Sequence, residues 1–134
     1  MRYAIVYVSS ASKDLKESEI KTILEHSVSW NNHQGLTGIL LFSEGNFFQI
    51  LEGEERVTKE LFEAIKKDPR HHNVIQIFGK EIHREAYDGY KADFISENAD
   101  YDPKKFKSYL KQIEVLDDST QKAVKNMLKA FILT

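Results

Sequence analysis

Apolar and polar residues follow a strand-like pattern at residues 3–8 and in two later segments, 36–42 and 47–51. A short Ser-Glu-Gly-Asn sequence separates the last two segments, and such a turn between two apolar runs is typical of a β-hairpin. One polar residue, Gln49, interrupts the second run. Burying an amide without partners costs about 1–3 kcal/mol. Gln49 therefore either faces solvent or has polar partners inside the protein.

Two segments have their apolar residues at helical spacing. The first begins near Leu15 and ends near residues 31–35, and the second is opened by Glu54-Glu55 and stops before Pro69. We expect Ser12 or Asp14 to cap the first helix, and Gly35 to end it in a left-handed conformation. Acidic residues at the start of the second helix suit the positive end of its dipole.

The remainder of the chain predicts two more strands and two more helices. Residues 73–82 are rich in β-branched and aromatic side chains, and residues 87–95 contain a fifth strand after an Asp-Gly turn. Asp102-Pro103 begins a short helix, and Asp118 or Ser119 caps a last one.

The element order predicts an α+β, ferredoxin-like βαββαββ fold with a five-stranded mixed sheet. We expect the first and third strands to be neighbouring, parallel and central, with the first two helices on one face. The two C-terminal helices then cover the other face with their apolar stripes. This divides the single domain into a core, residues 1–97, and a C-terminal helical extension, residues 98–134.

Three polar side chains converge in this arrangement. Tyr7 and Gln49 face the same side of the sheet as the apolar residues at every second position of their strands. Asn31 lies at the end of the apolar stripe of the first helix. If the helices cover that face of the sheet, a hydroxyl and two amides meet in an apolar layer and need a shared polar partner. A bound ligand with its own donors and acceptors meets that need.

Composition narrows the class of protein. The 134 residues are 41% hydrophobic and 30% charged with a net charge of −2, which favours a globular domain with neither nucleic acid nor membrane as a partner. The absence of cysteine excludes disulfides, thiolate metal sites and cysteine nucleophiles. No apolar run approaches the roughly 20 residues that span a bilayer, and no cleavable signal precedes the first strand. We expect a cytoplasmic protein.

Four ordered motifs carry a resemblance to a known family. They are Tyr7-Val8-Ser9-Ser10-Ala11, Asn31 ahead of Gly35-Leu36-Thr37-Gly38-Ile39-Leu40-Leu41, Phe47-Phe48-Gln49-Ile50-Leu51-Glu52-Gly53, and Asp68-Pro69-Arg70-His71-His72-Asn73-Val74. Together they resemble the BLUF domain, the blue-light sensor that uses flavin, in its short stand-alone form, and we expect a bacterial protein. The resemblance runs from Tyr3 to about Ile95 and implies a ferredoxin-like fold that holds flavin between its first two helices.

The resemblance also implies roles for particular residues. Tyr7 matches the tyrosine that gives an electron and a proton to the excited flavin, and Gln49 matches the glutamine between that tyrosine and flavin N5 and C4=O. Asn31 matches the asparagine that bonds the C4=O and N3 edge of the ring. The cofactor-binding set that we predict is Tyr7, Ile23, Ser27, Asn31, Asn32, Phe47, Gln49, Ile65, Asp68, Arg70 and His71.

The fifth strand departs from the family pattern. Many members carry a tryptophan and, two residues later, a methionine near the glutamine, where this chain has Tyr90 and Ala92. We expect these two positions to affect signal relay and the lifetime of the lit state, and not to affect flavin binding. Tyr90 is also a candidate for a competing electron donor.

The predicted function is a blue-light photoreceptor that is not an enzyme and signals through self-association or a separate effector protein. The predicted cofactor is FAD, with FMN and riboflavin left open. The alternative is a ferredoxin-like interaction module, with or without flavin, whose photochemistry is impaired. An acylphosphatase-like hydrolase is disfavoured because the loop after the first strand has no arginine. A metal site at His71, His72 and His83 is disfavoured because adjacent histidines on a strand or turn usually point apart.

Overall fold

The computed structural model describes residues 2–43, 45–82, 90–94 and 118–133. Its elements in chain order are β1 (Arg2–Ala11), α1 (Glu17–His33), β2 (Thr37–Ser43), β3 (Asn46–Glu54), α2 (Glu55–Lys66), β4 (His71–Ile82), β5 (Tyr90–Phe94) and α4 (Asp118–Leu133). The expected short helix near residue 102 lies outside the described residues.

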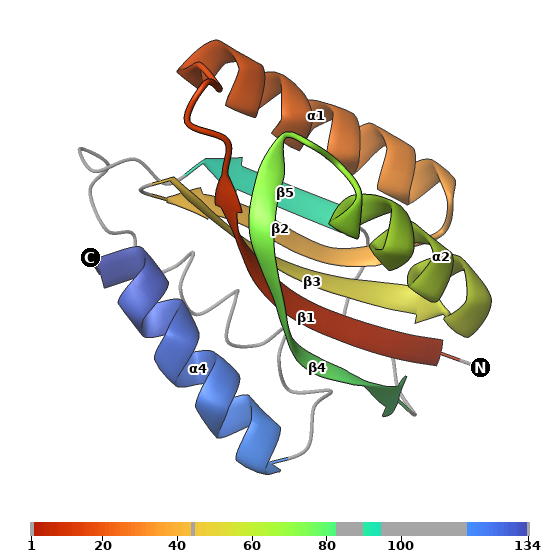
Figure 1. Ribbon diagram of the computed structural model, residues 1–134. Helices are drawn as coiled ribbons and strands as arrows, with labels where there is room; N and C mark the ends of the chain where they lie inside the picture. The colour runs from red at the N-terminus through yellow and green to blue at the C-terminus, as the bar shows by residue number, and fades with distance from the viewer. Residues whose placement is uncertain (1, 44, 83–89, 95–117, 134) are drawn as a thin grey trace.

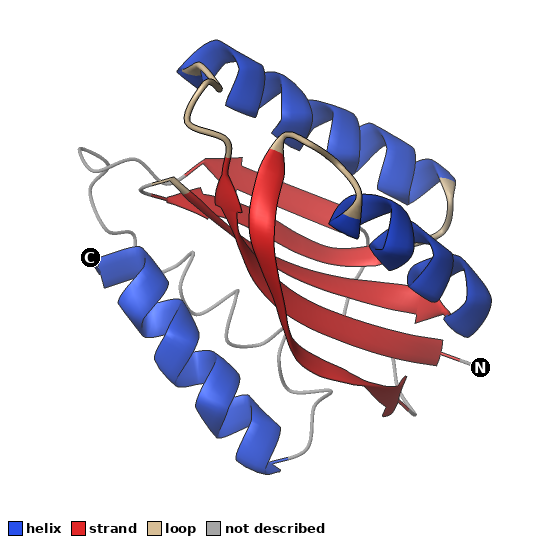
Figure 2. Cartoon of the chain, viewed as in Figure 1, coloured by secondary structure: helices blue, strands red, loops and turns tan. Residues whose placement is uncertain are grey.

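The strands form one sheet in the order β4-β1-β3-β2-β5. Its first four strands pair antiparallel, and β5 pairs parallel with β2. Figure 1 shows α1 and α2 on one face of this sheet and α4 on the other, and Figure 2 shows the same two layers of helix around the strands. The chain therefore has the α+β, ferredoxin-like architecture that the element order predicts.

The predicted parallel pairing of β1 with β3 is wrong. Tyr3 lies opposite Gly53 and Ser10 lies opposite Asn46, so the two strands run antiparallel. The reason is topological. The crossover through α1 makes β1 parallel to β2, and the tight hairpin returns β3 antiparallel between them. The position of β1 and β3 as central neighbours is as expected.

Two of the predicted helix ends, the end of α1 and the start of α2, are confirmed, and the predicted start of α1 is wrong. Gly35 follows α1 with φ +72°, which is the left-handed stop expected there. Glu54 caps α2, because its carboxylate accepts hydrogen bonds from the backbone N–H groups of Arg56 and Val57. The N-cap of α1, however, is Lys16 and neither Ser12 nor Asp14. Ser12 instead accepts a backbone hydrogen bond from Leu15 in the turn before the helix, and this turn delays the start of the helix.

The core has one layer on each side of the sheet. Under α1 and α2 the buried cluster consists of Ile20, Leu24, Leu40, Phe42, Phe47 and Leu51. Alternate residues of the central strands, such as Val6 and Phe48, are fully buried on the opposite face. Val124 of α4 is also fully buried. Among the described helices, none is both long and apolar enough to cross a membrane.

Candidate functional site

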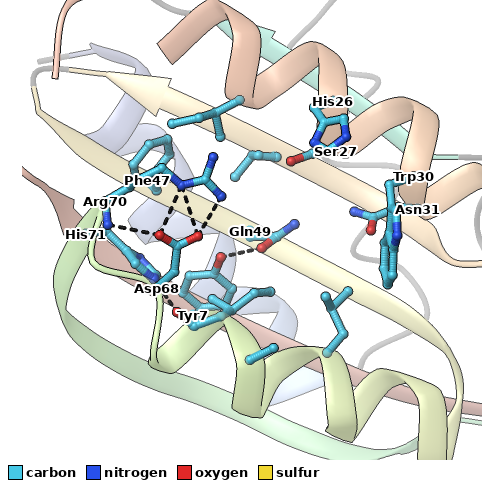
Figure 3. Close-up of a pocket in the computed structure, with 15 residues that line it drawn as sticks. Tyr7, His26, Ser27, Trp30, Asn31, Phe47, Gln49, Asp68, Arg70 and His71 are labelled. Carbon is cyan, nitrogen blue, oxygen red and sulfur yellow. Dashed lines mark hydrogen bonds and ion pairs between the residues drawn. The ribbon is translucent and has the colours of Figure 1, made fainter. Parts of the chain in front are cut away.

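A cavity of about 280 Å³ opens between α1, α2 and the sheet, and Figure 3 shows the side chains around it. Ten of the eleven predicted binding residues line it: Tyr7, Ile23, Ser27, Asn31, Phe47, Gln49, Ile65, Asp68, Arg70 and His71. Asn32 is not among the lining residues, and it is exposed on α1. The cavity thus gathers residues that lie up to 64 positions apart in the chain, from Tyr7 to His71.

Tyr7 and Gln49 form the floor of the cavity. They lie directly opposite each other on the central strands β1 and β3, and each is only 3% exposed. The Tyr7 hydroxyl donates a hydrogen bond to Oε1 of Gln49 (Figure 3). The amide that interrupts the apolar run of β3 therefore has a polar partner inside the protein. Of the two alternatives that the sequence left open for Gln49, exposure to solvent or an internal partner, the second is correct.

Asn31 supplies a second buried amide. It lies in the last turn of α1, where it is 4% exposed and lines the cavity. Its backbone carbonyl accepts a hydrogen bond from Leu36, but the structure gives its side-chain amide no hydrogen-bond partner among the described residues. A buried amide in this state is expected to bind whatever fills the cavity.

His71 connects three elements at the side of the cavity. Its Nε2 lies against the carbonyl oxygen of Ile65 near the end of α2, and its Nδ1 lies 2.8 Å from the hydroxyl of Ser9 on β1. A carbonyl oxygen only accepts hydrogen bonds, so Nε2 carries a proton and donates it. In the neutral ring, Nδ1 then accepts from Ser9. The ring is held at 6.4 Å from Tyr7 and 6.3 Å from Phe47, measured between ring centroids.

Asp68 and Arg70 form an ion pair at one end of the cavity (Figure 3). Nε of Arg70 lies 3.0 Å from both carboxylate oxygens of Asp68, and the backbone N–H of Arg70 donates to the same carboxylate at 2.9 Å. Hydrogen bonding from Arg70 holds the pKa of Asp68 below its ordinary value, and the carboxylate in turn raises the pKa of Arg70. Half of the Arg70 side chain stays exposed, so its guanidinium also faces solvent.

Five lining residues are absent from the predicted set: His26, Trp30, Leu40, Leu61 and Ala64. Leu61 lies one turn before Ile65 on α2, and His26 and Trp30 lie one turn apart on α1. The helical spacing of these positions from Ile23 and Ile65 is a signal that could have found them.

The side chains of Tyr90 and Ala92 lie outside the described residues, and only the backbone register of β5 bears on their roles. Ala92 lies opposite Leu40 of β2, and Leu40 lies opposite Gln49 of β3. The backbone of Ala92 is thus two strands from the amide that the resemblance makes central. The roles proposed for Tyr90 and Ala92 stay predictions.

Among the described residues, no group of three or more His, Cys, Asp and Glu side chains is placed to hold a metal ion. His71 and His72 are consecutive on β4, so their side chains leave opposite faces of the strand. His83, the third member of the histidine set considered from the sequence, lies outside the described residues.

Comparison with known proteins gives relatives among light sensors. The chain is 35% identical over 77 residues to the blue light- and temperature-regulated antirepressor BluF of Escherichia coli, and 30% identical over 83 residues to the photoactivated adenylate cyclase subunit beta of Euglena longa. These matches cover 58% and 62% of this chain, but only 19% and 10% of the two relatives.

Solved structures show the same fold. The structure of Klebsiella pneumoniae BlrP1 with FMN and cyclic diGMP superposes with a TM-score of 0.77 at 27% identity, covering 99% of this chain and 35% of that one. The structure described as BlrP1 BLUF gives a TM-score of 0.72 at 26% identity, covering 98% of this chain and 90% of that one.

The sequence profile of one family matches residues 3–93, which is most of the chain and includes every residue of the cavity. That family is described as sensors of blue-light using FAD. The resemblance drawn from the four motifs is confirmed: this chain belongs to the BLUF family of blue-light sensors.

Proposed function

We propose that the chain is a photoreceptor in which blue light rearranges the hydrogen bonds of Tyr7 and Gln49 around a bound flavin. The observation that carries this proposal is the buried hydrogen bond between these two side chains at the floor of the cavity, beside the amide of Asn31. The proposal fits a core, residues 1–97, that senses light, and a C-terminal extension, residues 98–134, that responds to it.

The cavity residues suit a flavin ring. Ile23 of α1 and Ile65 of α2 supply apolar walls from the two helices, and the sheet supplies the floor. The amide of Asn31 can donate to a ring carbonyl and accept from a ring N–H, which is the pattern that the pyrimidine edge of a flavin offers.

We propose FAD as the cofactor and leave FMN and riboflavin open, because the isoalloxazine ring is common to all three. Arg70 lies at the opposite end of the cavity from Asn31 and could meet a phosphate with its solvent-facing guanidinium. The family is described by its use of FAD, whereas the similar BlrP1 structure contains FMN. Ser27, which lines the cavity, is proposed as a further contact of the flavin. Asn32 is also proposed, but as a weaker contact, because it does not line the cavity.

The mechanism follows from the Tyr7–Gln49 pair. Bound flavin supplies absorption of blue light and an excited state that accepts one electron. Tyr7 would be the one-electron donor, and its existing hydrogen bond to Oε1 of Gln49 gives the phenolic proton a path away from the ring. Gln49 can then rotate or change tautomer, so that it presents a different group to each neighbour. The electron and the proton would return to Tyr7, so that no covalent adduct with the flavin is formed. The protein would then differ only in the rotamer or tautomer of Gln49 and in the hydrogen bonds that this side chain makes.

The stored signal is small, on the order of one or two hydrogen bonds. The output is therefore an equilibrium shifted by a few kcal/mol, and we propose association with a second copy or with a separate effector protein. The E. coli relative is an antirepressor by name, and the Euglena relative is a cyclase subunit by name. This chain spans a small part of either, so its own partner has to be found by experiment.

The test is an absorption spectrum of the purified protein, reconstituted with FAD, before and after blue light. We expect a small, reversible red shift, because a stronger hydrogen bond to the flavin C4=O lowers its transition energy. Gln49→Leu and Tyr7→Phe should retain flavin and lose the shift, whereas the exposed substitution Ile75→Ala should leave the shift unchanged. Protein that stays colourless with FAD would refute flavin binding. Yellow protein without a shift would leave the alternative of a flavin-binding interaction module.

A further inference from the structure

Trp30 occupies an unusual position at the edge of the cavity. It is the only tryptophan in the sequence, and it directly precedes the buried Asn31 near the end of α1. The residue is 42% exposed, yet part of its side chain lines the cavity. Figure 3 shows its indole beside Asn31, at the end of the cavity away from Arg70. A single exposed aromatic residue is common, but here its apolar surface faces a cavity that contains a buried amide.

The helix phase explains why Trp30 faces the cavity. Ile23, Ser27 and Trp30 are separated by four and three residues, so they lie on one face of α1 and all three line the cavity. Ile23 begins this wall and Trp30 ends it. Asn32 follows two residues after Trp30, about 200° further round the helix, and points elsewhere.

We propose that Trp30 contacts the pyrimidine end of the bound flavin and shields the hydrogen bonds of Asn31 from water. This inference rests on the photoreceptor function proposed above. An indole face or edge against a flat ring buries apolar area and adds an aromatic contact. Excluding water also strengthens the neighbouring amide hydrogen bonds, because solvent no longer competes for the same groups. Trp30 is thus a binding and positioning residue for the cofactor, and Tyr7 and Gln49 keep the photochemical roles.

The position of Trp30 predicts that it contacts the isoalloxazine ring of the ligand and not the phosphate. Riboflavin, FMN and FAD share the ring and differ only beyond the ribityl chain. Loss of the indole should therefore weaken all three ligands by the same factor, about tenfold. Substitution of Arg70, at the opposite end, should weaken FMN and FAD more than riboflavin, because only the first two carry phosphate.

The first experiment measures dissociation constants by calorimetry in the dark for the wild-type protein, Trp30→Ala, Trp30→Phe and Ile75→Ala, each with the three flavins. Ile75 is the matched control, because it is the other large apolar residue exposed in the described part of the chain and it does not line this cavity. We expect about a tenfold rise for Trp30→Ala, a smaller one for Trp30→Phe and none for Ile75→Ala. Equal affinities in wild type and Trp30→Ala would overturn the proposal.

The second experiment detects the contact directly and does not depend on photoactivity. Because the chain has one tryptophan, a ¹⁵N-labelled sample gives a single indole N–H resonance. Riboflavin should shift this resonance strongly in the wild-type protein, and an unmoved resonance in a flavin-saturated sample would overturn the proposal even if Trp30→Ala fails to fold.

The lit state of Trp30→Phe should also decay faster than that of wild type. Wild-type protein that binds no flavin would refute the photoreceptor function and this inference together, whereas wild type that photoconverts with an unmoved resonance would refute only this inference.

Discussion

The carboxylate of Asp68 is held by a residue only two positions along the chain. Hydrogen bonds from Arg70 lower the pKa of Asp68 in the folded protein, so the ionised carboxylate contributes stability above its unfolded pKa of about 4 and loses that contribution as the pH falls through the lowered folded value. Asp68→Asn should therefore reduce the unfolding free energy at neutral pH by less than about 1 kcal/mol, because both groups are partly exposed and solvent screens the pair.

The measurement is urea unfolding of wild type and Asp68→Asn across a pH series. The difference between them should shrink as the pH falls below about 4. A difference that stays constant over the whole series would show that the carboxylate charge is not what stabilises this end of the cavity. Arg70→Gln is the matched variant, because it removes the other charge of the same pair.

At the level of single residues, the sequence predicts the site where a polar side chain breaks an apolar pattern. Gln49 and Asn31 are such breaks, and both lie at the cavity. Asn32 is the predicted binding residue that lies outside the cavity, because one residue along a helix turns the side chain by about 100°. Trp30 was not predicted as a lining residue. Its spacing from Ile23 places it on the same face of α1, but only the packing of the helix on the sheet shows that the cavity extends as far as the end of that face.

Among the elements, the hairpin of β2 and β3 depends on Gly38. This glycine has φ +142°, and an added Cβ would overlap the backbone carbonyl oxygen of Ile50 on β3. Gly38→Ala should destabilise the protein by about 3 kcal/mol or more, because neither the backbone conformation nor the neighbouring strand can adapt cheaply. Urea unfolding followed by circular dichroism measures this loss.

Gly45 in the turn of the same hairpin provides the control. It also has a positive φ, +81°, but an added Cβ would meet no atom within 4 Å. Gly45→Ala should therefore cost only the conformational strain, about 1–2 kcal/mol. Equal losses for the two substitutions would show that the contact with Ile50 is unimportant.

The elements themselves were predictable because each has a periodic apolar face. The apolar residues at every second position predict the central strands, and helical spacing predicts α1 and α2 to within a few residues. The relative direction of β1 and β3 was not predictable from periodicity, since an alternating pattern is the same in either direction. The start of α1 was also missed, because the turn at Ser12 competes locally with the helix.

For the whole molecule, binding and folding are linked through the cavity. A ligand that binds only the folded protein adds about 2.7 kcal/mol of stability at a free concentration of 100 times its dissociation constant. For a chain of 134 residues this corresponds to a rise in melting temperature of roughly 10 °C. We expect FAD to produce this rise in a thermal denaturation experiment in the dark.

Two controls make the thermal experiment specific. Adenosine monophosphate lacks the isoalloxazine ring of the flavin and should leave the melting temperature unchanged. Asn31→Ala removes the buried amide and should reduce the rise that FAD produces. An equal rise in melting temperature with FAD and with adenosine monophosphate would mean that the isoalloxazine ring does not enter the cavity.

The direct opposition of Tyr7 and Gln49 on adjacent strands also constrains how such a chain can change during evolution. Side chains of a strand alternate between its faces, so deletion of one residue from β3 ahead of Gln49 would turn the amide to the opposite face. Deletion of two residues would restore the face but place Gln49 opposite Ser9 in place of Tyr7. Insertions and deletions in descendants that keep the light response should therefore be confined to the connections between elements, while β1 and β3 keep their lengths.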